Sequence, residues 1–291
     1  SDVYKRQVRA LAVDDEEMNL VVAKGVLGSY GIEVDTCLSG REAVAQCDSV
    51  SYDIIFLDHM MPGFDGVQTL KKIRELQNGL YQDLPMIALT ANTVSGAREM
   101  FRGEGFTEFV PKPIERTVLE RVLRRVLPKR FIQYSEGLGE ENPPMEEQAQ
   151  AVPVQAPEAG SEPAGGTQAP ADGPAAPYDR LAQAGVDVEM GLNYCCGDED
   201  FFKDMLRMFR DQSGDKKAEI ISLYEAANWA DYAVKVHALK STSLTIGAQA
   251  LSSQAKELEL AGKRGDADFI REHHAALMRA YDELCGQLAG I

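Results

Sequence analysis

Five side chains suited to metal and phosphate chemistry stand at the ends of short apolar runs in the first 130 residues. They are Asp14, Asp15, Asp58, Thr90 and Lys112. Three carboxylates that lie close together repel one another, and a hard dication with oxygen ligands, such as Mg²⁺, relieves that repulsion. Asp58 could then act as a nucleophile toward a phosphoryl group, while Thr90 and Lys112 stabilise the charge on its oxygens.

The apolar runs have the length of strands, and amphipathic stretches of helical length separate them. We expect strands at residues 8–13, 32–37, 53–57, 86–89 and 106–110. We expect helices at residues 17–29, 40–47, 66–76, 96–102 and 114–127. This alternation is typical of a doubly wound α/β fold with a five-stranded parallel sheet, whose site lies at the carboxyl ends of the strands. The five side chains should therefore converge on one edge of the sheet.

No strand pattern appears beyond residue 178, where long amphipathic stretches follow one another. They cover residues 198–212, 216–227, 231–246, 248–263 and 266–288. Glycines that we expect to end helices are Gly214, Gly247 and Gly265. The pattern predicts a separate all-α domain built as a four-helix bundle.

A candidate nucleophile, His237, lies in the middle of the stretch 231–246. Residues at three- and four-residue steps form the expected core face of this helix, namely Val236, Leu239, Ser243 and Ile246. The adjacent stripe holds His237, Lys240, Ser241 and Leu244. On that stripe we expect an exposed imidazole, which is a good nucleophile near neutral pH, beside an ammonium group that can stabilise phosphoryl charge. His273 and His274 are expected to be ordinary helix-surface residues.

The segment between these regions has a different composition. Residues 131–177 hold eight of the 13 prolines and eight acidic residues, with no lysine or arginine. Such a segment buries too little apolar surface to fold, so we expect a disordered linker. The expected organisation is a non-native or disordered lead at 1–7, which implies a natural chain that extends upstream, a first domain at 8–130, the linker at 131–177 and a second domain at 178–291.

The composition also limits the kinds of partner and the cellular location that we expect. The formal net charge of −16 argues against nucleic acid, because phosphate backbones require clustered basic residues. No uninterrupted apolar run reaches the ~18–20 residues that span a bilayer, so we expect no membrane insertion by this segment. Five cysteines without a C-x-x-C pair favour a reducing, cytoplasmic location.

Four segments of the first domain, VDDEEMN, LDHMMPGFDG, ALTAN and FVPKP, carry the chemistry described above. Over residues 8–128 the chain resembles the response-regulator receiver family, whose fold is flavodoxin-like. The resemblance implies that Asp58 is phosphorylated. It also implies a Mg²⁺ site at Asp14, Asp15, Asp58 and the backbone carbonyl of Met60.

The same resemblance assigns roles to three other residues. Thr90 and Lys112 would contact the phosphoryl group, and Thr90 would act with Phe109 as a conformational switch. The family often has Tyr at the position of Phe109. The hydrogen bond of that hydroxyl is unavailable here, whereas the rotamer change of the ring remains possible.

The string VHALKSTSLTIGA, which GDEDFFKDMLRMF precedes, is similar to the histidine-containing phosphotransfer (HPt) family over residues 180–288. The similarity implies that His237 is phosphorylated and that Lys240 is its electrostatic neighbour. The docking face for a partner would include Ser241, Leu244 and Gly247. Ser241 stands where the family often has Gly, a mild departure because Ser is also small.

Together the two resemblances imply phosphorelay signal transduction, as in the C-terminal part of hybrid sensor histidine kinases. A sensor kinase, of the same parent chain or a separate one, would donate to Asp58, and His237 would pass the phosphoryl group to a downstream receiver. The direction of transfer between Asp58 and His237 is left open.

Three alternatives remain. One is a phosphohydrolase with an aspartyl-phosphate intermediate, although the D-x-D motif of such enzymes is missing after the first strand. Another is the C-terminal fragment of a hybrid kinase whose catalytic core is absent. The third is a docking scaffold insensitive to phosphorylation. Neither a G-x-x-x-x-G-K-[ST] loop nor a kinase ATP-binding domain appears in the sequence, so we do not expect this chain to be an enzyme by itself.

Overall fold

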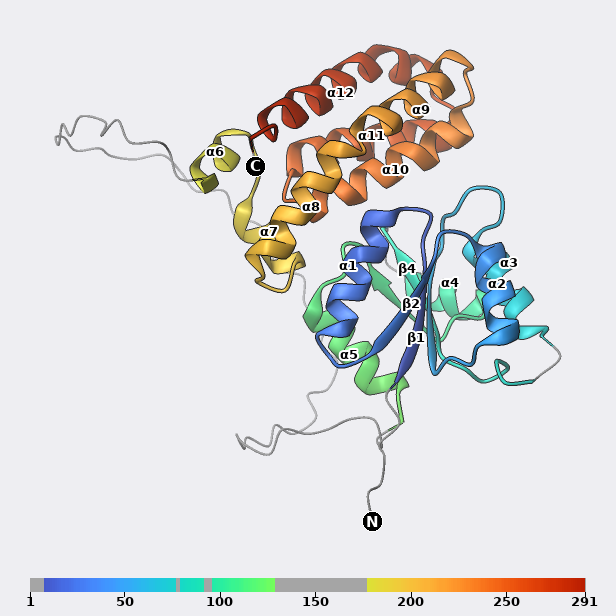
Figure 1. Ribbon diagram of the computed structural model, residues 1–291. Coiled ribbons are helices and arrows are strands. Elements are labelled where there is room, and N and C mark those ends of the chain that lie inside the picture. Colours follow the sequence, from blue (N-terminus) through green and yellow to red (C-terminus); the bar gives the residue numbers. More distant parts are fainter. Residues whose placement is uncertain (1–7, 77–78, 92–95, 129–176, 291) are drawn as a thin grey trace, which may run out of the picture.

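The computed structural model describes residues 8–76, 79–91, 96–128 and 177–290 (Figure 1). The expected lead at 1–7 lies outside these residues. So does the expected linker at 131–177, except for Pro177, which begins a helix. The described residues form an α/β domain at 8–128 and a helical domain at 177–290.

The α/β domain contains the parallel sheet that the sequence predicts. Its strands are β1 (Arg9–Val13), β2 (Glu33–Cys37), β3 (Ile54–Asp58), β4 (Met86–Thr90) and β5 (Glu108–Pro111). Its helices are α1 (Glu17–Gly28), α2 (Gly40–Ser49), α3 (Gly66–Arg74), α4 (Ala97–Glu104) and α5 (Arg116–Val126). The strand order is β2-β1-β3-β4-β5 with every pairing parallel. All ten elements begin and end within two residues of the expected ranges.

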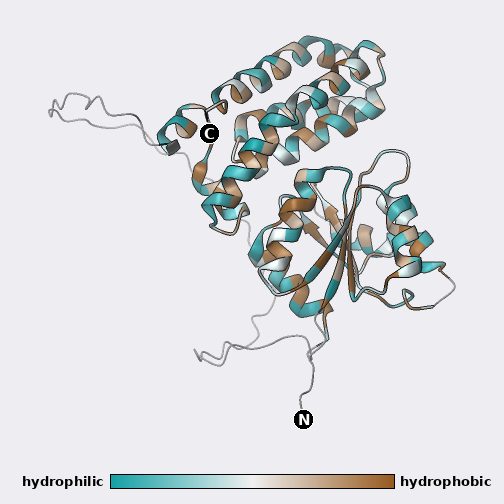
Figure 2. Cartoon of the chain, viewed as in Figure 1, coloured by the Kyte–Doolittle hydropathy of each residue, from teal (hydrophilic) through white to brown (hydrophobic). Residues whose placement is uncertain are grey.

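Alternation along the strands explains why helices cover both faces of the sheet. Ala10, Ala12 and Phe56 point into one apolar cluster with residues of α1 and α5. Leu11 and Leu57 point into a second cluster with residues of α2, α3 and α4. Successive side chains of a strand lie on opposite faces, so both faces of these strands are buried. Figure 2 shows the hydrophobic residues concentrated on the central strands and on the inner sides of the helices.

The helical domain has more elements than the sequence suggested. Its helices are α6 (Pro177–Gln183), α7 (Val188–Tyr194), α8 (Glu199–Asp211), α9 (Ser213–Glu225), α10 (Trp229–Thr245), α11 (Gln249–Arg264) and α12 (Ala267–Gln287). The two short helices α6 and α7 were not expected. Asp and Asn side chains accept hydrogen bonds from backbone N–H groups at the starts of α7, α8, α10 and α12, where those groups lack helical partners.

Two expectations for the helical domain are wrong. Gly214 does not end a helix but lies inside α9, after a break at Gln212, at a position where an added Cβ would meet no atom within 4 Å. His274 is buried rather than on the surface. Its ring stacks on Tyr224 with centroids 3.9 Å apart, and its Nδ1 lies 3.0 Å from the hydroxyl oxygen of Tyr232. The residue type and its polar neighbour His273 suggested a surface position, whereas the ring lies in the core of the bundle.

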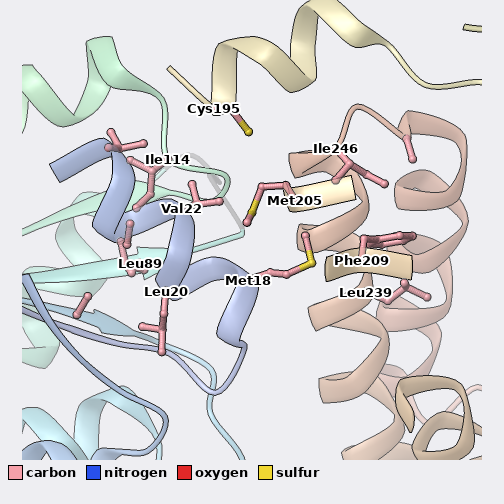
Figure 3. Close-up of a cluster of buried hydrophobic side chains, with 14 of the residues drawn as sticks. Met18, Leu20, Val22, Leu89, Ile114, Cys195, Met205, Phe209, Leu239 and Ile246 are labelled. Atoms are coloured by element: carbon pink, nitrogen blue, oxygen red, sulfur yellow. The ribbon is translucent and has the colours of Figure 1, made fainter. Parts of the chain in front are cut away.

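The two domains share one continuous apolar cluster. It joins Met18 and Val22 of α1 to Met205 and Phe209 of α8 and to Ile246 after α10. Figure 3 shows the Met18 side chain pointing from α1 toward α8 and α10. Burial of apolar surface between domains stabilises their contact by roughly 25 cal/mol per Å². None of the helices in the described ranges combines the length and apolar character needed to cross a membrane.

Candidate functional site

The three carboxylates meet at one edge of the sheet, as expected. Asp14 and Asp15 follow β1, and Asp58 is the last residue of β3, which pairs directly with β1. One oxygen atom from each of the three lies within 4.8 Å of the others. Oxygen donors at this spacing match the ligand preference of a hard divalent cation.

Lys112 lies among these carboxylates although it comes from the far end of the domain in sequence. Its Nζ is 2.9 Å from Oδ1 of Asp58 and 3.0 Å from Oδ2 of Asp14. Asn19 of α1 donates to both oxygens of Asp14 at 3.1 Å. A buried cation thus offsets part of the negative charge, while the amide holds Asp14 in place.

The uncompensated negative charge of the cluster shifts the pKa values of its members. Burial, followed by the charge of Asp14, raises the pKa of Asp15 to about 6. Burial and the two other carboxylates raise the pKa of Asp58 well above its ordinary value, against the opposing charge of Lys112. Burial alone would lower the pKa of Lys112, but Asp14 and Asp58 outweigh it and raise that pKa. Two carboxyl groups with raised pKa values indicate a site that is short of positive charge.

Other expected site residues of the α/β domain lie around this cluster. Thr90 ends β4 beside Pro111 of β5 and is buried. Phe109 is half-buried, with its ring centroid 5.4 Å from that of Phe101. The Met60 backbone N–H donates to Oδ1 of Asp58 at 3.2 Å. The structure therefore brings Asp14, Asp15, Asp58 and Lys112 into direct proximity.

The exposure expected for His237 is wrong. Only 4% of this residue is accessible, although it does not belong to the core stripe of α10. Val236, Leu239, Ser243 and Ile246 form that core, and each is at most 2% exposed. His237, Lys240 and Ser241 are buried on the neighbouring stripe. The reason lies in the α/β domain, which covers the stripe that the bundle leaves open.

A residue that the sequence reasoning missed, Glu259 of α11, organises the histidine. Its Oε1 lies 2.8 Å from Nδ1 of His237, and its Oε2 accepts from Nζ of Lys240 at 2.5 Å. Lys263 forms a second ion pair with the same carboxylate. The available signal was a carboxylate one turn after Ala255 on the otherwise small and apolar inner stripe of the helix.

These contacts define the state of the imidazole. A carboxylate accepts hydrogen bonds, so Nδ1 must carry the proton that it donates to Glu259. Burial, aided by the charges of Lys112 and Lys240 and opposed by Glu259, lowers the pKa of His237 to about 4. The ring is therefore neutral at pH 7, with its lone pair on Nε2. That atom is buried and has no hydrogen-bond partner among the described residues.

The carboxylate cluster and the histidine face each other across the domain contact. The Ser241 hydroxyl donates to Oδ1 of Asn19 at 3.4 Å, and Asn19 in turn holds Asp14. Lys112 and Lys240 line one cavity of about 240 Å³, with Leu244 and Ser241 on the same wall as Lys240. The stripe of α10 that holds His237 therefore lies against the α/β domain near its acidic site, close enough for the charge of Lys112 to act on the imidazole.

Gly247 is the exception among the expected docking residues. It has a φ of +81°, and an added Cβ would lie 2.1 Å from the backbone oxygen of Asp187. The Asp187 N–H also donates to the Gly247 carbonyl at 2.9 Å. The structure gives this glycine a role inside its own domain, where it ends α10 and allows close approach of the segment before α7.

Two family models match the chain. Residues 10–124 match the response regulator receiver domain, and residues 204–288 match the Hpt domain. The first match covers the carboxylates, Thr90 and Lys112. The second covers His237, Lys240 and Glu259.

Two relatives of the chain are histidine kinases. The chain is 33% identical over 128 residues to the signal transduction histidine-protein kinase BarA of Escherichia coli K12, a match that covers 44% of this chain and 14% of the kinase. It is 27% identical over 286 residues to the sensor histidine kinase GacS of Pseudomonas protegens, covering 98% of this chain and 27% of the kinase. The chain therefore spans about a quarter or less of the length of these kinases.

A solved structure with similarity to the chain is the receiver domain of a sensor histidine kinase from Pseudomonas aeruginosa, crystallised with a magnesium ion coordinated in its active-site cleft. The identity is 34%, the match covers 42% of this chain and 98% of that domain, and the TM-score is 0.37.

Proposed function

We propose that this chain, which belongs to the phosphorelay proteins and joins a response regulator receiver domain to an Hpt domain, carries a phosphoryl group on Asp58 and on His237 in turn. The observation that supports this proposal is the pairing of the two sites. Nε2 of a neutral histidine is buried without a partner in the described part of the chain, on a helix stripe that packs against the domain whose sheet edge holds three carboxylates and a lysine.

Asp58 is the proposed acceptor in the receiver domain. Asp14, Asp15, Asp58 and the Met60 carbonyl would hold Mg²⁺, a choice supported by the oxygen donor set and the raised pKa values of Asp15 and Asp58. The bound cation would neutralise charge on the phosphoryl oxygens and the carboxylates. Asp58 attacks the phosphorus of the donor phosphohistidine through a carboxylate oxygen, the bond from phosphorus to the donor nitrogen breaks, and the donor imidazole leaves. Lys112 and Thr90 stabilise the charge on the transferred group.

Transfer between the domains exchanges one bond for another. The Nε2 lone pair attacks phosphorus, the bond from phosphorus to the Asp58 oxygen breaks, and the carboxylate is released. The imidazole keeps its Nδ1 proton and gains positive charge, which the Glu259 carboxylate stabilises at 2.8 Å. Lys240 adds positive charge beside the transferred group. The reverse reaction uses the same groups.

A conformational response would accompany phosphorylation. Thr90 would move toward the phosphoryl group, and the Phe109 ring would pack inward into the space that it leaves. Phe109 is half-buried and lies against Phe101, so its ring is partly exposed before such a change. Because Phe109 lacks a hydroxyl, this switch depends on packing alone.

The partners follow from the chemistry. A sensor kinase with a phosphohistidine would supply the phosphoryl group, and a downstream receiver with its own aspartate would remove it. Five cysteines, all unpaired, support a cytoplasmic location. Transfer from Asp58 to His237 is the direction that we propose for the forward relay.

The decisive experiment labels the full chain with ³²P-acetyl phosphate and Mg²⁺. A phosphohistidine survives alkali, whereas an acyl phosphate is hydrolysed. We expect both forms in the unaltered chain, only the acyl phosphate in His237→Gln, and neither in Asp58→Ala. Equal alkali-stable labelling of His237 in Asp58→Ala would refute the proposed order. Continuous release of phosphate far beyond one equivalent would favour a hydrolase instead.

A further inference from the structure

We infer that the chain's own receiver caps His237, and that an outgoing receiver must displace it from the same face of α8, α9 and α10. This inference rests on the proposed function. The Hpt domain offers one candidate phosphohistidine, His237, and neither of its ring nitrogens is open to solvent. Glu259 engages Nδ1, and Nε2 is buried without a hydrogen-bond partner among the residues that the structure describes, on the stripe of α10 against which the receiver packs. A second receiver therefore cannot reach Nε2 while the first is in place.

Ionic contacts fix one end of the cap. Glu16, next to Asp14 and Asp15, forms an ion pair with Lys216 of α9. The side-chain amide of Gln212 donates to Glu17 at 2.8 Å. Lys235 of α10 also contributes positive charge near Asp15 and Glu16. The Hpt face thus presents basic and amide groups to the acidic start of α1.

Close packing fixes the other end. The Phe201 ring of α8 lies against Gly25 of α1, where an added Cβ would fall 2.6 Å from the ring. Met18 fills the space between these contacts and reaches α8 and α10 (Figure 3). A side chain at position 25 would therefore force the Phe201 ring to move from its docked position.

These contacts define the partner chemistry. A receiver that docks on this face needs a carboxylate opposite Lys216 and a glycine, or comparable space, opposite Phe201. The chain's own receiver meets both requirements and is tethered, which gives it a high effective concentration. Phosphoryl transfer out of the chain then depends on how often the cap opens.

The first test adds a side chain at the domain contact and then removes the ring that it would meet. Gly25→Leu in the full chain places a side chain against Phe201 while raising the helix propensity of α1. The matched control is Gly28→Leu, one turn later in the same helix, where an added Cβ meets nothing within 4 Å. Adding Phe201→Ala to Gly25→Leu removes the clash. The measurement is the rate at which diethyl pyrocarbonate modifies His237, followed by peptide mass spectrometry.

We expect Gly25→Leu to raise that rate about tenfold, which corresponds to a shift of about 1.4 kcal/mol in the opening equilibrium. Gly28→Leu should react like the unaltered chain, and Phe201→Ala should return the double variant toward it. Fast modification of His237 in the unaltered chain, equal to that in Gly25→Leu, would overturn the inference. So would an equal increase in Gly28→Leu.

The second test addresses the ionic end. Lys216→Glu removes the ion pair across the domains, and the control Lys217→Glu removes a neighbouring ion pair to Asp282 within the Hpt domain. Only Lys216→Glu should speed modification of His237. Equal effects of the two variants would contradict the cap. Because this readout needs no phosphorylation, it is independent of acetyl phosphate labelling, whose failure would count against the proposed function instead.

Discussion

Glu259 accepts a hydrogen bond from Nδ1 of His237 across 2.8 Å, and this contact determines which ring nitrogen is free to react. The same carboxylate binds Lys240 and Lys263, so it links the histidine to the positive charge around it. Burial alone would raise the pKa of Glu259. The hydrogen bond from His237 and the charge of Lys240 reverse that effect and hold the pKa below its ordinary value.

Glu259→Gln should slow phosphoryl transfer to His237 without unfolding the bundle. The amide keeps the shape and can accept from Nδ1, but it cannot neutralise the charge that the ring gains. Hydrogen bonds to charged groups contribute about 1.5–3 kcal/mol, so we expect a decrease of roughly tenfold to a hundredfold in the transfer rate. Rapid-quench sampling of alkali-stable label measures it. Transfer at the unaltered rate would show that the carboxylate charge is not used.

Acid should destabilise the docked chain through His237. Its pKa is about 4 in the structure, below the ordinary 6.5, so unfolding takes up a proton between these values. The neutral, buried imidazole of His237 contributes fully to the free energy of unfolding above pH 6.5, and this contribution is lost as the pH falls toward 4. At pH 5 we expect a loss of about 2 kcal/mol relative to pH 8. Urea unfolding measures the free energy of unfolding at both pH values. Its decrease from pH 8 to pH 5 should be smaller by that amount in His237→Gln than in the unaltered chain, and parallel pH profiles of the two proteins would contradict this assignment.

Magnesium affinity should increase with pH across the range in which Asp15 loses its proton. The pKa of Asp15 is about 6, and a protonated carboxyl is a poor metal ligand. Below pH 6 we expect the dissociation constant to rise at least about tenfold per pH unit, whereas above pH 7 the proton on Asp15 no longer competes. Calorimetric titration with MgCl₂ measures the slope. Asp15→Asn should bind more weakly with a smaller pH dependence, and an unchanged slope would place the competing proton elsewhere.

Lys112→Ala should destabilise the metal-free chain and make it depend more strongly on Mg²⁺. The variant leaves Asp14 and Asp58 buried without their lysine, a change that typically costs about 3–5 kcal/mol. A dication supplies the missing charge, so Mg²⁺ should raise the melting temperature of the variant more than that of the unaltered chain. An equal Mg²⁺-dependent increase in both would show that Lys112 does not offset the carboxylates.

The carboxylate site could be predicted from the sequence because the topology of a parallel sheet fixes where its residues lie. Parallel strands with buried faces must end at the same edge, so Asp14, Asp58 and Lys112 converge whatever their distance along the chain. The apolar stripe of α10 was equally predictable, since its period of three to four residues reports what the helix buries within its own bundle. These features depend on local periodicity and strand order alone.

Tertiary structure alone decided the state of His237. Periodicity places this residue beside the core stripe of α10, yet another domain covers it, and a pattern within one helix carries no information about a surface contributed from more than a hundred residues away. The pairing of Glu259 with His237 joins two helices through side-chain geometry that spacing does not encode. Gly247 likewise meets Asp187, a contact set by the path of the chain before α7. The sequence by itself determined the reactive groups and their host elements, whereas packing between elements and domains decided which atoms of those groups are charged, covered or free.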